Sequence, residues 1–219
     1  MVQKPQVLLD PDAGSGGMRS APDSPTPGVF PSPESMRPTL VGDHYMIAAG
    51  HPIVAQVAAH VLERGGNAID AGVAAGIASN VVQVDMANFG GIAPILVRTA
   101  GSGEVWSISG VGTWGRQATL EAFHERFGAR MPLGGGCAIV PGAPAAWIAA
   151  LQHFGTWPFG DVAAPAIELA AEGVPLDRRT AVALEILGEG FSQWESSRAV
   201  YWPAGRPPRA GERLAQPAL

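Results

Sequence analysis

Hydrophobic residues recur every three or four positions between residues 53 and 62, which is the spacing of one face of an α-helix. His51-Pro52 precedes this run, and proline suits the first turn of a helix because its missing N–H would have no intrahelical partner there. Gly65-Gly66 follows the run and is typical of a helix end. The pattern therefore predicts a helix between these two motifs. A shorter apolar run before it, residues 46–49, predicts a buried strand.

A second helical segment begins after Asn67, a preferred residue for the N-terminal cap. The segment runs to about residue 80 and consists mainly of alanine, glycine, valine and isoleucine, with Asp70 as its only charged residue. Small residues nearly all round a helix allow neighbouring elements to pack closely against it. We therefore expect this helix to be central and mostly buried.

Residues 93–98 and 105–109 are expected to be two strands, because the glycine-containing link between them has the length of a hairpin loop. The apolar run of residues 137–140 predicts another buried strand. Four further helices are expected, at residues 120–127, 141–151, 159–172 and 178–187. The chain after Gly188 is expected to be irregular. Hairpin strands and helices in consecutive pairs favour an α+β fold over an alternating βαβ fold.

The composition narrows the class of protein. Of the 219 residues, 47% are hydrophobic and 15% are charged, which excludes a wholly disordered chain. The formal net charge of −5, with only 14 lysines and arginines, gives no electrostatic footprint for nucleic acid. No uncharged apolar stretch is long enough for a membrane span. A single cysteine, Cys137, excludes an internal disulfide and a cysteine-based zinc cluster.

Residues 1–41 differ from the rest of the chain because they are rich in proline, serine and glycine. Each proline removes a backbone donor and fixes φ, so neither a helix nor a central strand is expected. The longest apolar run there, Val7-Leu8-Leu9, is too short for the core of a secretory signal. We therefore predict a disordered leader over residues 1–41, one domain over residues 42–219 and a cytoplasmic location.

Local motifs offer no complete catalytic site. Residues 110–115 fit G-x-G-x-x-G, but no acidic residue follows at the spacing of a dinucleotide site, so a tight structural loop is favoured. The five histidines lack the spacing of metal ligands, and we expect neither a metal nor a cofactor. Cys137 with His124 or His153 as its base is an alternative nucleophile, but a buried structural cysteine is favoured.

Several runs, in order, resemble the start of the gamma-glutamyltransferase (gamma-glutamyltranspeptidase) family. The first three are MIAAGHP at residues 46–52, GGNAIDA at 65–71 and NFGG at 88–91. Further landmarks follow in the family's order: VPG at 140–142, FGT at 154–156, PAIELA at 165–170 and GERL at 211–214. The stretch from residue 42 to residue 219 is therefore similar to the N-terminal part of the family's large subunit.

The resemblance implies part of an N-terminal-nucleophile (Ntn) hydrolase fold, an αββα sandwich of two antiparallel sheets with flanking helices. It also implies a precursor that cleaves itself, after which the new N-terminal threonine of the small subunit attacks an amide with its own α-amine as base. That threonine lies beyond the tail landmarks of the family. This chain is therefore expected to be a fragment that contains no catalytic residue and is inactive without the small subunit.

Gamma-glutamyl enzymes of the family carry an arginine after the second hairpin strand, and its guanidinium binds the α-carboxylate of the glutamyl group. Counted from the hairpin, Val111 beside Gly110 takes that place here, and a valine cannot bind a carboxylate. We therefore expect substrate binding near Gly110 and Val111 but a small amide other than glutathione. Arg116 is an alternative cation, although a solvated surface arginine is favoured.

Two hypotheses of different classes follow from the resemblance. In the first, the chain is a piece of an N-terminal-threonine amidohydrolase or acyltransferase, with the rest of the enzyme as its partner and a small amide as substrate. In the second, the chain is a truncated, non-catalytic paralogue or a partner-binding subunit. Neither hypothesis involves nucleic acid or a membrane.

Overall fold

The computed structural model describes residues 2–3, 40–128 and 130–219. The chain divides into two units, one of residues 1–4 and 47–219 and the other of residues 5–46. The predicted disordered leader falls almost entirely outside the described residues. Within it, Val2–Gln3 forms a short strand, β1, which the proline-rich composition did not predict.

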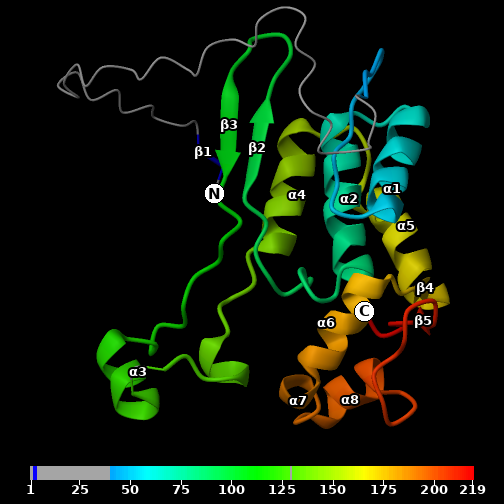
Figure 1. Ribbon diagram of the computed structural model, residues 1–219. Coiled ribbons are helices and arrows are strands. Elements are labelled where there is room, and N and C mark those ends of the chain that lie inside the picture. The colour runs from blue at the N-terminus through cyan, green and yellow to red at the C-terminus, as the bar shows by residue number, and fades with distance from the viewer. Residues whose placement is uncertain (1, 4–39, 129) are drawn as a thin grey trace, which may run out of the picture. The chain divides into compact units, whose positions relative to one another are not determined.

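Four helices form the main helical layer of the larger unit: α1 (Pro52–Glu63), α2 (Ala68–Val82), α4 (Ala143–Phe154) and α5 (Phe159–Glu172). Helix α2 contacts each of the other three and lies among them in Figure 1. Nine of its 15 residues are buried. The expectation of a central, mostly buried helix is therefore confirmed, and its small residues explain how three neighbours approach it.

The sheet is antiparallel. Strands β2 (Ile95–Arg98) and β3 (Val105–Ile108) form the predicted hairpin, with Val97 opposite Trp106. Strand β1 pairs with the other edge of β3, so the strand order is β1-β3-β2. A second pair joins β4 (Val174–Pro175) to β5 (Arg213–Leu214). All strand pairs in the described part of the chain are antiparallel, and the mixed α+β class is confirmed.

Helix α3 (Leu120–Phe127) coincides with its predicted range, and α6 (Arg178–Ile186) ends one residue short of its own. The chain after Gly188 was expected to be irregular, which is wrong. It contains two short helices, α7 (Gly188–Phe191) and α8 (Glu195–Tyr201), followed by β5. Short helices of this kind carry too little hydrophobic periodicity to be recognised from a single sequence.

Two predicted strands are absent from the described structure. Residues 46–49 have no regular structure, and Ile47 packs against the core without pairing to a strand. Residues 137–140 were also expected to be a strand, but Gly134–Cys137 forms a 3₁₀ turn and Val140 makes only an isolated bridge to Thr113. An apolar run becomes a strand only where another strand offers free backbone groups, and neither run meets one among the residues that the structure describes.

The core consists mainly of aliphatic side chains from α1, α2, α4 and α5, with Ile108 of β3 and Trp147 of α4. A smaller cluster joins Leu176, Leu184 and Leu214 around α6 and β5. Among the helices that the structure describes, none is both long and apolar enough to cross a membrane. The C-terminal end of β3, where Ile108 joins the main core, leads into the predicted site.

Candidate active site

The predicted site residues, Gly110 and Val111, lie immediately after β3. The N–H of Ala93 donates a 2.9 Å hydrogen bond to the carbonyl of Gly110, which continues the hairpin beyond its last ladder pair. Gly110 has a φ of +54° and Gly112 a φ of +80°, values that favour glycine. The two glycines therefore set the direction of the main chain on either side of Val111.

Three chain segments meet at this point, at the start of α4. The N–H groups of Gly142 and Ala143 both donate to the carbonyl of Gly91, at 3.1 Å each, and the N–H of Val140 donates to the carbonyl of Thr113 at 2.8 Å. A Cβ on Gly142 would lie 2.7 Å from the carbonyl carbon of Gly110. The main chains approach too closely at Gly142 for a side chain to fit, which explains why glycine stands there.

Gly110 and Gly112 belong to the G-x-G-x-x-G run, and both are used in this contact. A Cβ on Gly110 would collide with the carbonyl of Ala93, and one on Gly112 with the carbonyl of Val140. The run thus packs one segment against two others. This arrangement favours the structural interpretation of the motif over a dinucleotide site.

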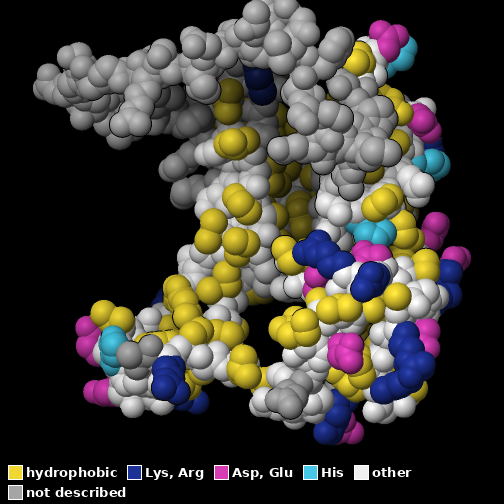
Figure 2. Space-filling model, in the orientation of Figure 1, with side chains coloured by type: hydrophobic (Ala, Val, Ile, Leu, Met, Phe, Trp, Pro, Cys, Tyr) yellow, Lys and Arg dark blue, Asp and Glu magenta, His cyan; other side chains and the backbone are white. Residues whose placement is uncertain are grey.

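The side chain of Val111 is 46% exposed, and three neighbours in the joined segments, Ile92, Trp114 and Val140, are exposed as well. Figure 2 shows hydrophobic side chains along the hairpin and on toward α3. The surface at Val111 is therefore apolar and open. Its role in substrate binding stays a prediction.

Cys137 does not occupy the buried strand that was expected. It is exposed at the end of the 3₁₀ turn, where its Sγ donates to the carbonyl of Gly134 at 3.0 Å. In the described part of the chain no hydrogen bond joins Cys137 to His124 or His153, and His153 lies against the ring of Phe154. No cluster of three potential metal ligands occurs among the described residues.

Asp70 has a structural role that the sequence analysis missed. It is fully buried, and its Oδ2 accepts a 2.8 Å hydrogen bond from the N–H of Asn67, which completes a capping box at the start of α2. It also accepts from Thr156 Oγ1 at 2.6 Å and from the N–H groups of Thr156 and Trp157. The N-x-x-D spacing of Asn67 and Asp70 was the available signal for the cap.

The charge of Asp70 is stabilised by these donors. Burial by itself raises the pKa of its carboxyl group, but the hydrogen bonds from Thr156, Asn67 and Trp157 outweigh burial and hold the pKa below its ordinary value. Asn67 Nδ2 also donates to the carbonyl of Phe154 at 2.7 Å. The start of α2 is thereby fixed to the turn between α4 and α5.

His51 connects two helix starts. Its Nδ1 accepts from the N–H of Ile53 at 3.2 Å and caps α1, while its Nε2 lies 3.4 Å from Asp177 Oδ2. Asp177 in turn caps α6 through the N–H of Thr180 at 2.7 Å. That backbone hydrogen bond is the main reason why the pKa of Asp177 lies below its ordinary value, with His51 adding to the effect.

Comparison with known proteins gives the family. Residues 54–219 match the family model for gamma-glutamyltranspeptidase. The glutathione hydrolase proenzyme of Bacillus subtilis is 32% identical over 82% of this chain and 31% of its own length. The oxamate amidohydrolase proenzyme of Klebsiella pneumoniae is 32% identical over 84% of this chain and 36% of its own length.

The fold agrees with these matches. The crystal structure of Helicobacter pylori gamma-glutamyltranspeptidase superposes with a TM-score of 0.77 and 30% identity, over 82% of this chain and 52% of that chain. The structural neighbours are Ntn hydrolases, and this chain spans about a third of the length of the curated relatives it matches. The chain belongs to the gamma-glutamyltranspeptidase family.

Proposed function

We propose that this chain is the N-terminal part of the large subunit of an N-terminal-threonine amidohydrolase or acyltransferase. The observation that carries the proposal is the family match over residues 54–219, which covers only about a third of the curated relatives' length. Those relatives are named proenzymes, which supports a second subunit as partner. In this proposal the partner supplies the threonine nucleophile, and the chain is inactive without it.

The same proposal extends to the fold and to the domain layout. The hairpin of β2 and β3 is part of one layer of an αββα sandwich. Residues 42–219 form an incomplete domain behind a leader of residues 1–41, whose Val2–Gln3 pairs with β3. Two features support this arrangement: all its pairs are antiparallel, and α4 packs on β3. In this proposal the remaining strands and the second helical layer belong to the rest of the large subunit and to the small subunit.

The substrate is a small amide other than glutathione. An exposed apolar Val111 at the end of β3 supports this, because a valine offers no donor to the α-carboxylate of a glutamyl group. The Klebsiella relative, named for oxamate, also supports a short carboxamide as substrate. The reaction is amide hydrolysis through an acyl-enzyme on the partner's threonine.

The test begins with the coding region past codon 219. We expect an open frame that contains a threonine at a self-cleavage site, and the complete product should appear as two chains by mass spectrometry. It should release ammonia from oxamate or another short carboxamide faster than it cleaves gamma-glutamyl-p-nitroanilide. A stop codon directly after Leu219 would refute the enzymatic proposal, and a preference for the gamma-glutamyl compound would refute the substrate assignment.

A second candidate function, a non-catalytic partner-binding subunit, is favoured by the exposed apolar side chains of the hairpin, since Leu96 is 76% and Val105 is 44% exposed. Exposed apolar patches mark interaction sites. The 219-residue chain alone should then bind a hydrophobic dye and self-associate, and Leu96→Lys should reduce both. A soluble monomer that binds no dye would contradict this candidate.

A further inference from the structure

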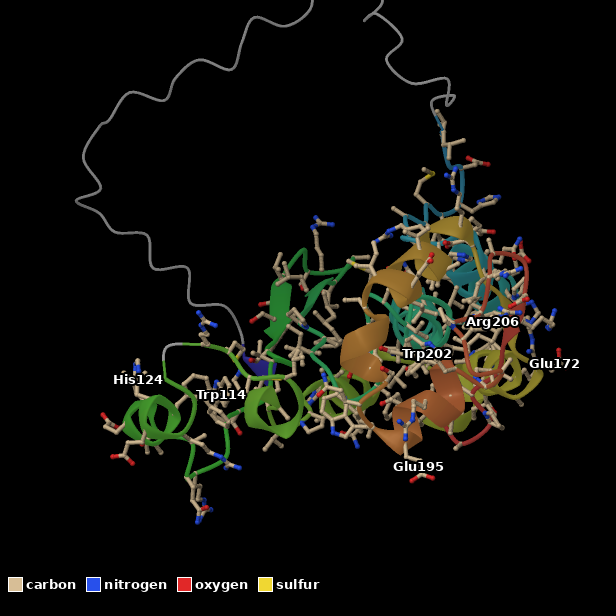
Figure 3. The ribbon with its side chains drawn as sticks, turned by 60° about the horizontal axis from the view of Figure 1, so that its bottom comes forward. Trp114, His124, Glu172, Glu195, Trp202 and Arg206 are labelled. Atoms are coloured by element: carbon tan, nitrogen blue, oxygen red, sulfur yellow. The ribbon has the colours of Figure 1, made fainter. Side chains whose placement is uncertain are left out.

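A cavity of about 540 Å³ lies against α3 and is not used by the site at Val111. Its walls are the loop of residues 114–118, one face of α3 and the 3₁₀ turn. The side chains that matter for its chemistry are Trp114, Arg116, Phe123, Arg126 and Phe127. Figure 3 shows Trp114 next to α3, whereas His124 projects away from the loop on the outer side of that helix.

The aromatic wall of this cavity has a clear origin in the sequence. Thr119 caps α3 by accepting the N–H of Ala122 at 3.2 Å, and Phe123 and Phe127 then lie one turn apart with ring centroids 5.2 Å from each other. A Cβ on Gly136 would lie 2.7 Å from Phe127 Cζ. The glycine therefore leaves room for the Phe127 ring beside the 3₁₀ turn.

The cavity is positively charged. Arg116 and Arg126 line it, and no aspartate or glutamate is among its described lining residues. Neither guanidinium forms an ion pair with a carboxylate in the part of the chain that the structure describes. The guanidinium of Arg126 lies 5.1 Å from the ring centroid of Phe127, so cation and aromatic face are adjacent.

The cavity adjoins the candidate active site. The bridge between Thr113 and Val140 holds two chain segments together beside Val111. The next residue after Thr113, Trp114, and the residue two positions before Val140, Ala138, both line the cavity. A molecule in the cavity therefore lies just beyond the point where these segments join.

We propose that this cavity binds an aromatic carboxylate. Arg116 and Arg126 hold the carboxylate, because paired guanidinium donors match its two oxygens. The rings of Trp114, Phe123 and Phe127 contact the aromatic part of the ligand. The ligand is separate from the small amide substrate of the proposed function. Its carboxylate is held by the two arginines and not at Val111.

The binding test uses the 219-residue chain and phenylacetate, titrated by calorimetry and by tryptophan fluorescence. We expect saturable binding, and phenylacetamide, which has the same shape without charge, should bind at least about tenfold more weakly. Arg116→Gln and Arg126→Gln should each weaken phenylacetate binding by about fivefold or more. Arg130→Gln removes a guanidinium that does not line the cavity and should leave binding unchanged.

Unchanged urea midpoints of the two cavity variants establish that any loss of binding is not unfolding. If either variant unfolds, Arg116→Lys is tested in its place. Lysine keeps the positive charge but lacks the paired N–H donors of a guanidinium, so this variant should bind phenylacetate with intermediate affinity. Equal affinity for phenylacetate and phenylacetamide, or insensitivity to both arginine substitutions, would overturn the proposal. Much tighter binding of phenylphosphonate would overturn the carboxylate assignment in favour of a phosphate group.

The outcome is separable from that of the proposed function, because binding requires no nucleophile. An active complete product whose large subunit fails to bind phenylacetate would remove only the cavity proposal. Binding by the chain, together with a complete product that hydrolyses no amide, would remove only the enzymatic proposal.

Discussion

Thr156 Oγ1 donates a 2.6 Å hydrogen bond to Asp70 Oδ2, although 86 positions separate the two residues in sequence. The bond joins the GGNAIDA run at the start of α2 to the FGT run after α4. Two separate landmarks of the family are thus parts of one buried hydrogen-bonded group. Its purpose is structural, because it fixes where α2 begins relative to the turn before α5.

Replacing Asp70 with asparagine should destabilise the chain strongly. The amide group would point a donor at the N–H or hydroxyl donors that now meet a carboxylate, which leaves buried groups unpaired. We expect a loss of about 3 kcal/mol in the free energy of unfolding, measured in urea.

Asp43→Asn is the matched control, because the side chain of Asp43 is 95% exposed. It should change the free energy of unfolding by less than about 0.5 kcal/mol. Equal effects of the two substitutions would show that the hydrogen-bonded group at Asp70 does not stabilise the fold.

The stability that Asp70 provides should depend on pH. Its pKa in the folded chain lies below the ordinary value of 3.8, so the unfolded chain binds a proton first as the solution is acidified. The contribution is present above pH 3.8 and is lost as the pH falls through the folded-state pKa. The stability difference between the wild type and Asp70→Asn should therefore shrink on going from pH 7 to about pH 3.

Urea unfolding of both proteins at several pH values measures this difference. Other carboxylates lose their contributions equally in both proteins; Glu212, whose pKa is lowered to about 2 mainly by its hydrogen bond from Arg206, is one of them. A difference that stays constant from pH 7 to about pH 3 would show that the charge of Asp70 is not what stabilises the fold.

Because main chains are in close contact beside Val111, replacing glycine with alanine should destabilise the fold there, although the same replacement stabilises an open helical position. Gly142 has an ordinary φ of −101°, so Gly142→Ala adds only a Cβ, which would press on the backbone of Gly110. We expect a loss of about 3 kcal/mol, since backbone atoms cannot move aside as a side chain can. Thermal and urea unfolding would measure it.

Gly72→Ala is the reference for that experiment. Gly72 lies inside α2, and a Cβ there would meet no atom within 4 Å. Alanine should stabilise the helix by about 0.5–1 kcal/mol. A neutral Gly142→Ala beside a stabilising Gly72→Ala would mean that the three segments are not in contact.

Substitution of Val111 should change which substrate the complete product prefers. In the complete product, Val111→Arg should raise kcat/KM for gamma-glutamyl-p-nitroanilide by about 10- to 100-fold, because a guanidinium can hold the α-carboxylate. Val111→Leu keeps the site apolar and should leave that value near the wild-type level. If Val111→Arg does not raise this kcat/KM in a protein that still cleaves its small amide, residue 111 is not the position that recognises the carboxylate.

The sequence predicted the elements whose ends carry their own signals. The boundaries of α1 follow from Pro52 and the glycines after it, and α2 begins after its cap at Asn67. Helices α3 and α5 coincide with their predicted ranges, since Thr119 and Pro158 open them and Gly128 and Gly173 close them. Local chemistry decides these cases, so a single sequence suffices.

Elements that depend on distant partners were missed or predicted wrongly. An extended run such as residues 137–140 needs a partner strand to become a strand, and in the described part of the chain it forms only the isolated bridge to Thr113. In the sequence, Asp70 is simply the one charged residue of a buried helix, because its hydrogen-bond donors Thr156 and Trp157 lie far along the chain. The aromatic and cationic side chains of the α3 cavity come from the loop of residues 114–118 and from α3. The 3₁₀ turn that completes the wall contributes only glycine and alanine, so the sequence gives no sign of it.

The contact among Gly110, Gly112 and Gly142 has a consequence for how this site can change. The hydrogen bonds and close contacts described for this loop come from its main-chain atoms and not from the side chain of residue 111. On the proposed substrate site, a single substitution there would exchange one recognition chemistry for another without removing these contacts. In that proposal, folding and substrate choice depend on different atoms of the same short segment.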